Sequence, residues 1–578
     1  MLKKTFIILN ECEIKYIPKS SKKIFTFSPF LVKEIQKSNL NVEFPNPHET
    51  AISSEIRLKK VQEYSDEITH SIKFNTIFKY INEYEELLAP YLHLRLSPFF
   101  YMKESLPESE SYCLFVKGNW KVFNEKVDAI IEIEKILSKE SYFYKEIFAL
   151  GDFYNSPTFF KEMEFLFNKL LGFIQKIIFK MFINNKEELF VLSDNKKYFL
   201  PKIKNSLKLK NKMTISLVAW QSCLGKIKSI LKLLINIFSK KRISDATFFL
   251  TPINMLSVSD VKKQIYNLFP NIIKEDEKFK KRLILDISTY LIFIDGYQKY
   301  LFSLLDRKNI KSTILHSTRY SELYSLASIM SKLASKVFLI SHGTHTVQKN
   351  NHLDFIANKQ LALALLYSKL ENIIHCSQSL FSDDYLLSIK FKFKQINHLS
   401  IISAEKSKKK KSKFIILHAS TIKAFNKRSY YYESSFEYIE GIKFLANKLN
   451  SLSKELEIIV RPRLLKEELT YDYLKDELFE FKKFVKISDN KEFLKDLTNC
   501  DCLISLSSTT LEQAFNMGIP CLSFGFTKYN HFGSYSHLNI DSSYHHFKIL
   551  SQIEKKLKRK FIYSLNPEIS REDFFEII

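Results

Sequence analysis

Two observations in the second half of the chain predict an α/β fold with two Rossmann-like domains and a helix-rich N-terminal region. Short apolar runs alternate with amphipathic stretches, a pattern typical of parallel βαβ units. Polar clusters follow the apolar runs at the points where strands would end. Ligands of doubly wound sheets bind outside the carboxyl ends of the strands, so these clusters are candidate sites.

The first alternating series begins with a strand over 312–318 and a helix over 319–335. A second strand starts at 336 and runs into the polar stretch "SHGTHT", residues 341–346. The run "AEKSKKKKSK", residues 404–413, follows this series and is expected to be a solvated linker at a domain boundary.

The second series is longer and predicts a doubly wound domain of moderate size. Its expected strands cover 414–421, 456–463, 484–489, 501–510 and 519–525. Its expected helices cover 431–452, 490–500 and 511–518.

The first half is less regular, although 125–141 and 159–183 have helical patterns and 112–118 and 245–253 resemble strands. The pattern does not give the order of elements there. We therefore divide the chain into a helix-rich N-terminal α/β region, the part that completes a first Rossmann-like domain, and a second Rossmann-like domain. These three regions cover residues 1–240, 241–403 and 404–578.

Composition narrows the possible functions. Hydrophobic residues make up 45% of the chain and charged residues 26%, which indicates a globular protein. The formal net charge of +25 favours an anionic partner: a nucleic acid, a phosphorylated substrate or an acidic bilayer surface. The lysines are dispersed and no nucleic-acid-binding module is recognisable, so a nucleic-acid partner is not expected.

Cysteine usage and apolar run lengths indicate a cytoplasmic protein. The seven cysteines include no CxxC pair, so the sequence predicts neither a zinc site nor a disulfide framework. The N-terminal apolar run is broken at Asn10 and Glu11, which indicates a first strand rather than a signal peptide. No window reaches about 18 uninterrupted apolar residues, so no transmembrane helix is expected.

Four consecutive hydroxyl residues lie between an expected strand and an expected helix: Ser507, Ser508, Thr509 and Thr510. Hydroxyls and unsatisfied backbone N–H groups at a helix N-terminus favour an anion, particularly a phosphate. The alternative is that they only cap the helix, for which one Ser or Thr suffices. Glu512 would either complete a cap or bind a sugar or ribose hydroxyl.

The stretch "DCLISLSSTTLEQAFNMGIPCLSFG", residues 501–525, resembles the nucleotide-binding half of GT-B glycosyltransferases of bacterial capsule and lipopolysaccharide synthesis. These include sialyl-type and Kdo-type transferases and glycerophosphotransferases. The resemblance covers about the last 270 residues. It implies that 241–403 completes an acceptor-side domain and that 404–578 binds the nucleotide-sugar donor.

Such transferases often have a His-Pro pair upstream of the Ser/Thr cluster, where this chain has Arg461-Pro462. An arginine can hold a phosphate bidentately, so Arg461 is a candidate donor-binding residue. The loop after the first strand of the domain commonly touches donor phosphates in this architecture. His418, Ser420 and Thr421 occupy that loop here, with an ordinary polar loop as the alternative.

The turn "SHGTHT" contains two candidate catalytic histidines, His342 and His345. The resemblance implies that one of them is the general base that deprotonates the acceptor hydroxyl, work that suits the pKa of imidazole. Alternatively, a histidine only hydrogen-bonds a carbonyl in the turn. A metal site with Asp354 lacks supporting residues, and no metal or cofactor is expected.

We therefore expect an inverting, metal-independent glycosyltransferase that moves a sugar from a nucleotide-sugar donor to a surface glycan or glycolipid. The resemblance favours a CMP-linked acidic sugar. The alternatives are a GT-B nucleotide-sugar epimerase and a basic nucleic-acid-binding protein. Two basic amphipathic stretches, 225–242 and 547–561, suit peripheral contact with the anionic inner face of the plasma membrane, or else are core-facing helices with solvated lysines.

Overall fold

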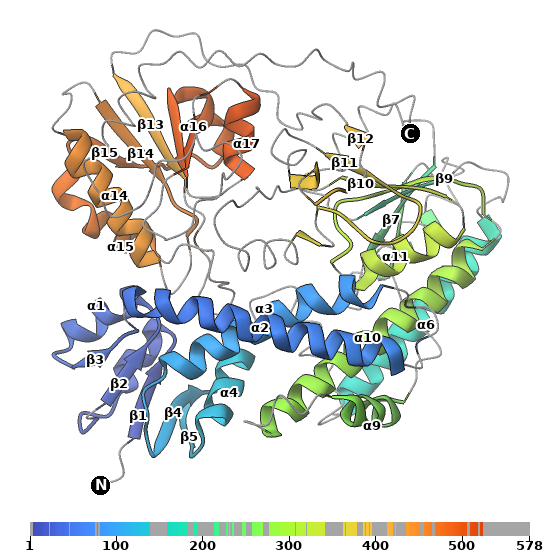
Figure 1. Cartoon of the computed structure of the whole chain (residues 1–578), viewed down its shortest axis with the longest axis horizontal. Helices are drawn as coiled ribbons and strands as arrows, with labels where there is room; N and C mark the ends of the chain where they lie inside the picture. The colour runs from blue at the N-terminus through green and yellow to red at the C-terminus, as the bar shows by residue number, and fades with distance from the viewer. Residues whose placement is uncertain are drawn as a thin grey trace.

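The computed structural model of the chain contains three sheets built mainly from parallel strands, with helices between them (Figure 1). We refer to them as the N-terminal, central and C-terminal sheets. The structure describes residues 4–21, 23–45, 47–75, 78, 81, 83–138, 159–182, 189–193, 213–218, 227–228, 230–231, 234–235, 245–249, 257–269, 277–306, 308–319, 321–333, 335–340, 362–363, 366–377, 385–387, 389–391, 394–395, 413–419, 422, 435–450, 456–464, 469–505, 509–517, 519 and 521–523.

The N-terminal sheet has the order β3-β2-β1-β4-β5, and only the β4–β5 pair is antiparallel. Lys117 and Gly118 form the tight turn of that pair with φ of 51° and 90°, the left-handed conformation that two-residue hairpin turns require. The strands are β1 (Lys4–Ile8), β2 (Lys23–Thr26), β3 (Val42–Glu43), β4 (Ser111–Val116) and β5 (Asn119–Phe123). The helices are η1 (Glu11–Tyr16), α1 (Pro29–Lys37), α2 (Pro47–Asn75), α3 (Tyr84–Ser105) and α4 (Lys126–Ser138).

The central sheet is parallel throughout, with the order β12-β11-β10-β9-β6-β7-β8. Its strands are β6 (Leu189–Ser193), β7 (Met213–Val218), β8 (Asp245–Phe249), β9 (Ile310–Leu315), β10 (Lys336–Ile340), β11 (Ile373–Ser377) and β12 (Lys394–Gln395). The helices of this region are α6 (Phe159–Phe182), α9 (Val258–Leu268), α10 (Glu277–Leu305) and α11 (Ser321–Lys332).

The C-terminal sheet is also parallel, with the order β15-β14-β13-β16-β17. Its strands are β13 (Phe414–Ala419), β14 (Leu456–Arg461), β15 (Val485–Ile487), β16 (Cys502–Ser505) and β17 (Cys521–Ser523). Its helices are α14 (Ser435–Asn450), α15 (Tyr471–Glu477), η4 (Phe479–Phe481), α16 (Phe493–Asn499) and α17 (Thr509–Asn516).

Both of these sheets have the strand order of a doubly wound fold. The order reverses between β6 and β9 in the central sheet and between β13 and β16 in the C-terminal sheet. At such a switch point the connections leave toward opposite faces of the sheet, which opens a crevice at the carboxyl ends of the two strands. We therefore expect functional side chains at these two switch points.

The N-terminal region packs against both of the other sheets. Helices α2, α3 and α4 share one apolar core with α6, α9, α10, α11 and one face of the central sheet. A second core joins Ile8 and Ile24 of the N-terminal sheet to Ile416 and Ile458 of the C-terminal sheet. Figure 1 shows α2 and α3 running between the N-terminal sheet and the rest of the chain.

A buried ionic cluster fixes the relative positions of α3, α4 and α10. Arg95 contacts Asp286 at 2.8 Å and Glu134 at 3.2 Å, and Arg282 contacts Asp286 at 3.1 Å. Burial raises the pKa of the Glu134 carboxyl, because an apolar surrounding disfavours its charge. In their ionised forms the four side chains carry two positive and two negative charges, so removing any one of them would leave the buried cluster with an unbalanced charge. The cluster therefore requires all three helices to be in place.

The expected α/β class with parallel sheets is confirmed, and the expected helices at 125–141 and 159–183 form α4 and α6. The N-terminal region, for which the pattern did not give the order of elements, contains a sheet of its own. In the stretch 225–242, Ile230 is buried and Ile227 and Leu234 pack on the core, whereas Leu231 and Ile235 are exposed. The lysine-rich run 404–412 and the tail 547–561 lie outside the described residues.

Candidate functional site

The carboxyl edge of the C-terminal sheet contains most of the predicted donor-binding residues. Strand β16 ends at Ser505 and α17 begins at Thr509, so the hydroxyl cluster spans the strand-to-helix junction at the switch point. Thr509 and Glu512 lie in the first half of α17, and Thr510 is half-buried. Four other predicted residues lie outside the described part of the chain: Ser420, Thr421, Ser507 and Ser508.

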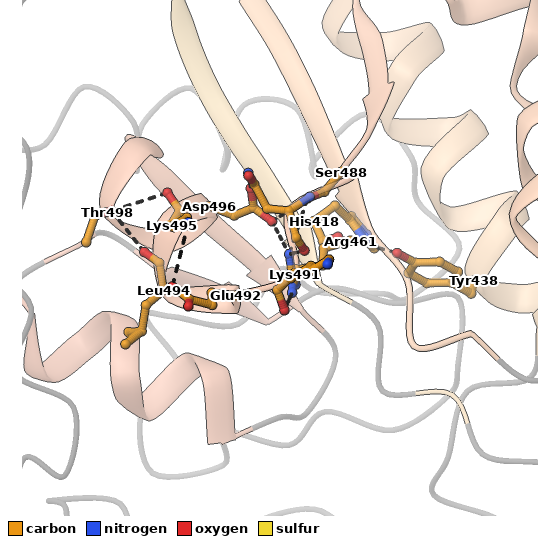
Figure 2. Close-up of polar contacts among 11 residues, drawn as sticks. His418, Tyr438, Arg461, Ser488, Lys491, Glu492, Leu494, Lys495, Asp496 and Thr498 are labelled. Carbon is orange, nitrogen blue, oxygen red and sulfur yellow. Dashed lines mark hydrogen bonds and ion pairs between the residues drawn. The ribbon is translucent and has the colours of Figure 1, made fainter.

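His418 is the penultimate residue of β13 and is 1% exposed. Its ring lies beside that of Tyr438 from α14, with centroids 5.2 Å apart, and the Tyr438 hydroxyl donates to the His418 carbonyl (Figure 2). Neither ring nitrogen has a hydrogen-bond partner in the part of the chain that the structure describes. Burial lowers the pKa of His418 to about 4, so the imidazole is neutral near pH 7.

A neutral, buried imidazole has one donor and one acceptor available, and this limits what His418 can do. It offers no positive charge to a phosphate, in contrast to the usual role of a cation at such a site. Ser505 ends the neighbouring strand, is fully buried, and its hydroxyl also has no partner among the described residues. His418 pairs with Ile504, so Ser505 points to the opposite face of the sheet.

Arg461 ends β14, and its guanidinium has several protein partners. It forms an ion pair with Asp496 of α16 and donates to the Ser488 hydroxyl at 3.2 Å and to the Asn490 carbonyl at 2.9 Å (Figure 2). The Asp496 side chain is 2% exposed, so this carboxylate depends on Arg461 for its counter-charge. Arg461 thus joins β14 to α16, and a contact with a donor phosphate stays a prediction.

The carboxyl edge of the central sheet contains the second group of candidates. Strand β9 ends at Leu315 and is followed by His316, which is 9% exposed. Strand β10, its parallel neighbour, ends at Ile340. The predicted histidines His342 and His345 come directly after that strand in the sequence, but they lie outside the described residues.

Glu86 is a buried carboxylate that sequence patterns did not indicate. It projects from the first turn of α3 and accepts hydrogen bonds from the hydroxyls of Thr318 and Ser368 and from the backbone N–H of Lys369. Burial outweighs these donors and raises the pKa of Glu86 to about 7. Thr318 follows β9, so Glu86 joins the N-terminal region to the carboxyl edge of the central sheet.

Glu322 is a second carboxylate that the sequence analysis did not single out. It is the second residue of α11, the helix that follows β9 at the switch point of the central sheet, and the Ser321 hydroxyl donates to it at 3.3 Å. Loss of hydration raises the pKa of Glu322 to about 7. Because Glu322 follows the end of a predicted strand, its position in the sequence could have marked it as a candidate site residue. Glu86 lies in an ordinary helical stretch, where no such pattern marks it.

The described residues contain neither a metal-binding cluster nor a helix suited to crossing a membrane. No set of three or more His, Cys, Asp or Glu side chains within that part of the chain is arranged to hold a metal ion. None of the described helices has the length and apolar character needed to cross a membrane.

No family model matches the chain, and no curated protein matches it. Among solved structures it is similar to a UDP-GlcNAc 2-epimerase from Neisseria meningitidis bound to UDP-GlcNAc, with 12% identity, 65% of this chain and 94% of that chain covered, and a TM-score of 0.33. A Listeria monocytogenes protein provisionally assigned as a UDP-N-acetylglucosamine 2-epimerase has 10% identity, coverage of 65% and 89%, and a TM-score of 0.35. A glycosyltransferase from Rickettsia africae has 11% identity, coverage of 64% and 88%, and a TM-score of 0.31. Likeness at this level assigns neither a family nor an activity to this chain.

Proposed function

We propose that the chain is a GT-B glycosyltransferase that uses a nucleotide-sugar donor and acts on a surface glycan or glycolipid. The observation that supports this most is the position of β16 and α17 at the switch point of a doubly wound sheet, because the four consecutive hydroxyl residues 507–510 come between this strand and the start of this helix in the sequence. Hydroxyls and free N–H groups at the start of a helix suit the phosphates of a nucleotide.

In this proposal the donor lies across the carboxyl ends of β13 and β16. Ser508 and Thr509 bind the phosphates, and the hydroxyls of Ser507 and Thr510 assist them. Glu512 binds a hydroxyl of the ribose or sugar. The neutral imidazole of His418 is suited to a hydroxyl or base edge rather than to a phosphate, because it lacks positive charge.

The acceptor lies at the carboxyl edge of the central sheet, where β9 and β10 end. His342 or His345 removes the proton of the acceptor hydroxyl, whose oxygen then attacks the anomeric carbon as the bond to the nucleotide phosphate breaks. The N-terminus of α17 offsets the charge that develops on the departing nucleotide, so the proposed inverting reaction needs no metal ion.

A nucleotide-sugar epimerase is the second candidate, and Glu322 is the observation that favours it. Its carboxyl group lies at the switch point of the central sheet, and a carboxyl with a pKa of about 7 exchanges protons readily near neutral pH. Removing and returning a proton on a sugar carbon requires such a group.

One experiment separates the two functions. The full-length protein is incubated with each of a set of nucleotide sugars, with and without acceptor glycan, and the products are identified by NMR. A transferase releases free nucleotide and extends the glycan only when acceptor is present. Epimerised nucleotide sugar in the absence of acceptor would overturn the transferase proposal.

A further inference from the structure

Helix α6 has one face that packs on the protein and one apolar face that does not. On the inner face, Leu171, Ile178 and Phe179 belong to the large core, and the Tyr300 hydroxyl of α10 donates to the Gly172 carbonyl at 3.4 Å. These contacts hold α6 along the side of the molecule next to α10 (Figure 1). The apolar inner face of α6 is therefore buried against the core of the protein.

The outer face of α6 is apolar as well. Five large side chains follow one another at helical spacings of three and four residues, with exposed fractions from 41% to 69%. They are Leu166 at 58%, Leu170 at 52%, Phe173 at 60%, Ile177 at 41% and Met181 at 69%. A helix on the surface of a globular protein normally presents polar residues on its solvent-facing side. This apolar stripe therefore indicates a surface that binds a partner.

A second helical segment also exposes large apolar side chains. Within residues 227–235, Leu231 and Ile235 are 51% and 64% exposed and lie one helical turn apart. Ile230 of the same segment is buried in the core that also contains Leu171. The segment is thus attached to the protein on one side while it presents apolar side chains on another.

The charges of α6 determine which partner suits the stripe. The part of α6 that carries the stripe, residues 165–182, contains three lysines, Lys169, Lys176 and Lys180, and no acidic residue, while the first turns of the helix contain Lys161, Glu162 and Glu164. Burial lowers the pKa values of Lys176 and Lys308, because loss of hydration disfavours a charged ammonium, and the nearby charge of Lys180 lowers them further. Lys169 and Lys180 are exposed beside the apolar stripe.

From this combination we propose that the outer face of α6 docks on a bilayer that contains anionic lipids. Exposed Leu, Phe, Ile and Met side chains enter the acyl boundary while the lysines contact lipid phosphates, the arrangement of helices that lie in the plane of a membrane. A second copy of this chain is a poorer partner, because pairing two such faces would bring lysines against lysines.

Vesicle co-sedimentation of the full-length protein tests the proposal. Vesicles of phosphatidylcholine alone are compared with vesicles containing about 30% phosphatidylglycerol at physiological salt. We expect binding to the anionic vesicles, and we expect Phe173→Glu/Ile177→Glu to weaken it roughly a hundredfold, since two apolar side chains are lost from the membrane. Lys169→Gln/Lys180→Gln should lower the preference for anionic lipid.

Ile56→Glu is the matched control, because Ile56 is an exposed apolar residue, at 70%, on another long helix, α2. It should leave vesicle binding unchanged, and thermal unfolding should show that every variant is folded. Vesicle binding that survives Phe173→Glu/Ile177→Glu would overturn the proposal, as would failure of the wild-type protein to bind. A concentration-dependent dimer in light scattering that the same double substitution abolishes would identify a second copy as the partner instead.

Discussion

The hydroxyl of Ser368 contacts both carboxylate oxygens of Glu86, at 2.6 and 2.8 Å, across a separation of 282 residues. Thr318 and the backbone N–H of Lys369 donate to the same carboxylate. Glu86 therefore connects α3 of the N-terminal region to the carboxyl edge of the central sheet through a group that titrates near neutral pH. This link makes the stability of the protein depend on pH.

Replacing Glu86 with glutamine should reduce that dependence. Burial raises the pKa of Glu86 from 4.5 to about 7, so the folded state prefers the protonated carboxyl. The resulting stability is fully present below pH 4.5 and is lost as pH rises through about 7, a change of roughly 3 kcal/mol. The thermal unfolding midpoint should fall less between pH 5 and pH 8 in Glu86→Gln than in the wild type.

Glu322→Gln is tested in parallel, because the pKa of Glu322 is also raised to about 7 and its titration contributes to the pH dependence over the same range. Each variant should remove its own part of the pH dependence. Equal pH slopes for Glu86→Gln and the wild type would contradict the assignment of a raised pKa to Glu86.

Arg461 should behave as a residue that stabilises the C-terminal sheet. Arg461→Ala leaves the Asp496 carboxylate, which is 2% exposed, without its counter-charge, and we expect a loss of about 3–5 kcal/mol. Asp496→Asn in the same background should recover part of that loss, which denaturant unfolding of the single and double variants measures. Additive effects of the two substitutions would show that the pair is not coupled.

The hydroxyl cluster should contribute to nucleotide binding rather than to folding. Ser508→Ala/Thr509→Ala should weaken nucleotide affinity by roughly 1–3 kcal/mol, the loss expected when hydrogen bonds to a charged group are removed. Calorimetric titration of a folded double variant measures this. Unchanged affinity in the folded variant would reduce the cluster to a helix cap.

His342 and His345 should affect turnover more than binding. If one is the general base, its replacement by alanine should lower the transfer rate by about 10²–10⁴-fold and leave nucleotide affinity nearly intact. We expect this of His342, because it follows the end of β10 most closely and Gly343 permits a tight turn beside it. Loss of nucleotide binding in both alanine variants would make the turn a donor-binding element.

The alternating second half was predictable because parallel sheets bury both faces of each strand and give continuous apolar runs. β13, β14 and β16 thus follow from "FIILHA", "LEIIVR" and "CLIS". The N-terminal sheet was not predictable in the same way. Its strand β3 has two residues, and β1 and β4, which pair in parallel, are about a hundred residues apart in sequence.

The candidate site was only partly predictable for a related reason. A polar cluster at the end of an apolar run can be read locally, as at Ser507–Thr510. The partners of a side chain are set by tertiary packing, so the ion pair of Arg461 with Asp496 could not be predicted from the sequence. The burial of Glu86 depends on Ser368, far away in sequence.

The most direct test of the proposed function is nucleotide binding by the full-length protein. Its thermal unfolding midpoint is measured with CMP, CDP, UDP, GDP and TDP, since a ligand that binds only the folded state raises the midpoint. We predict a rise with at least one of them, with CMP favoured, and a smaller rise in Ser508→Ala/Thr509→Ala. No shift with any nucleotide, together with binding to single-stranded or duplex DNA at physiological salt, would contradict the account and favour a nucleic-acid-binding protein.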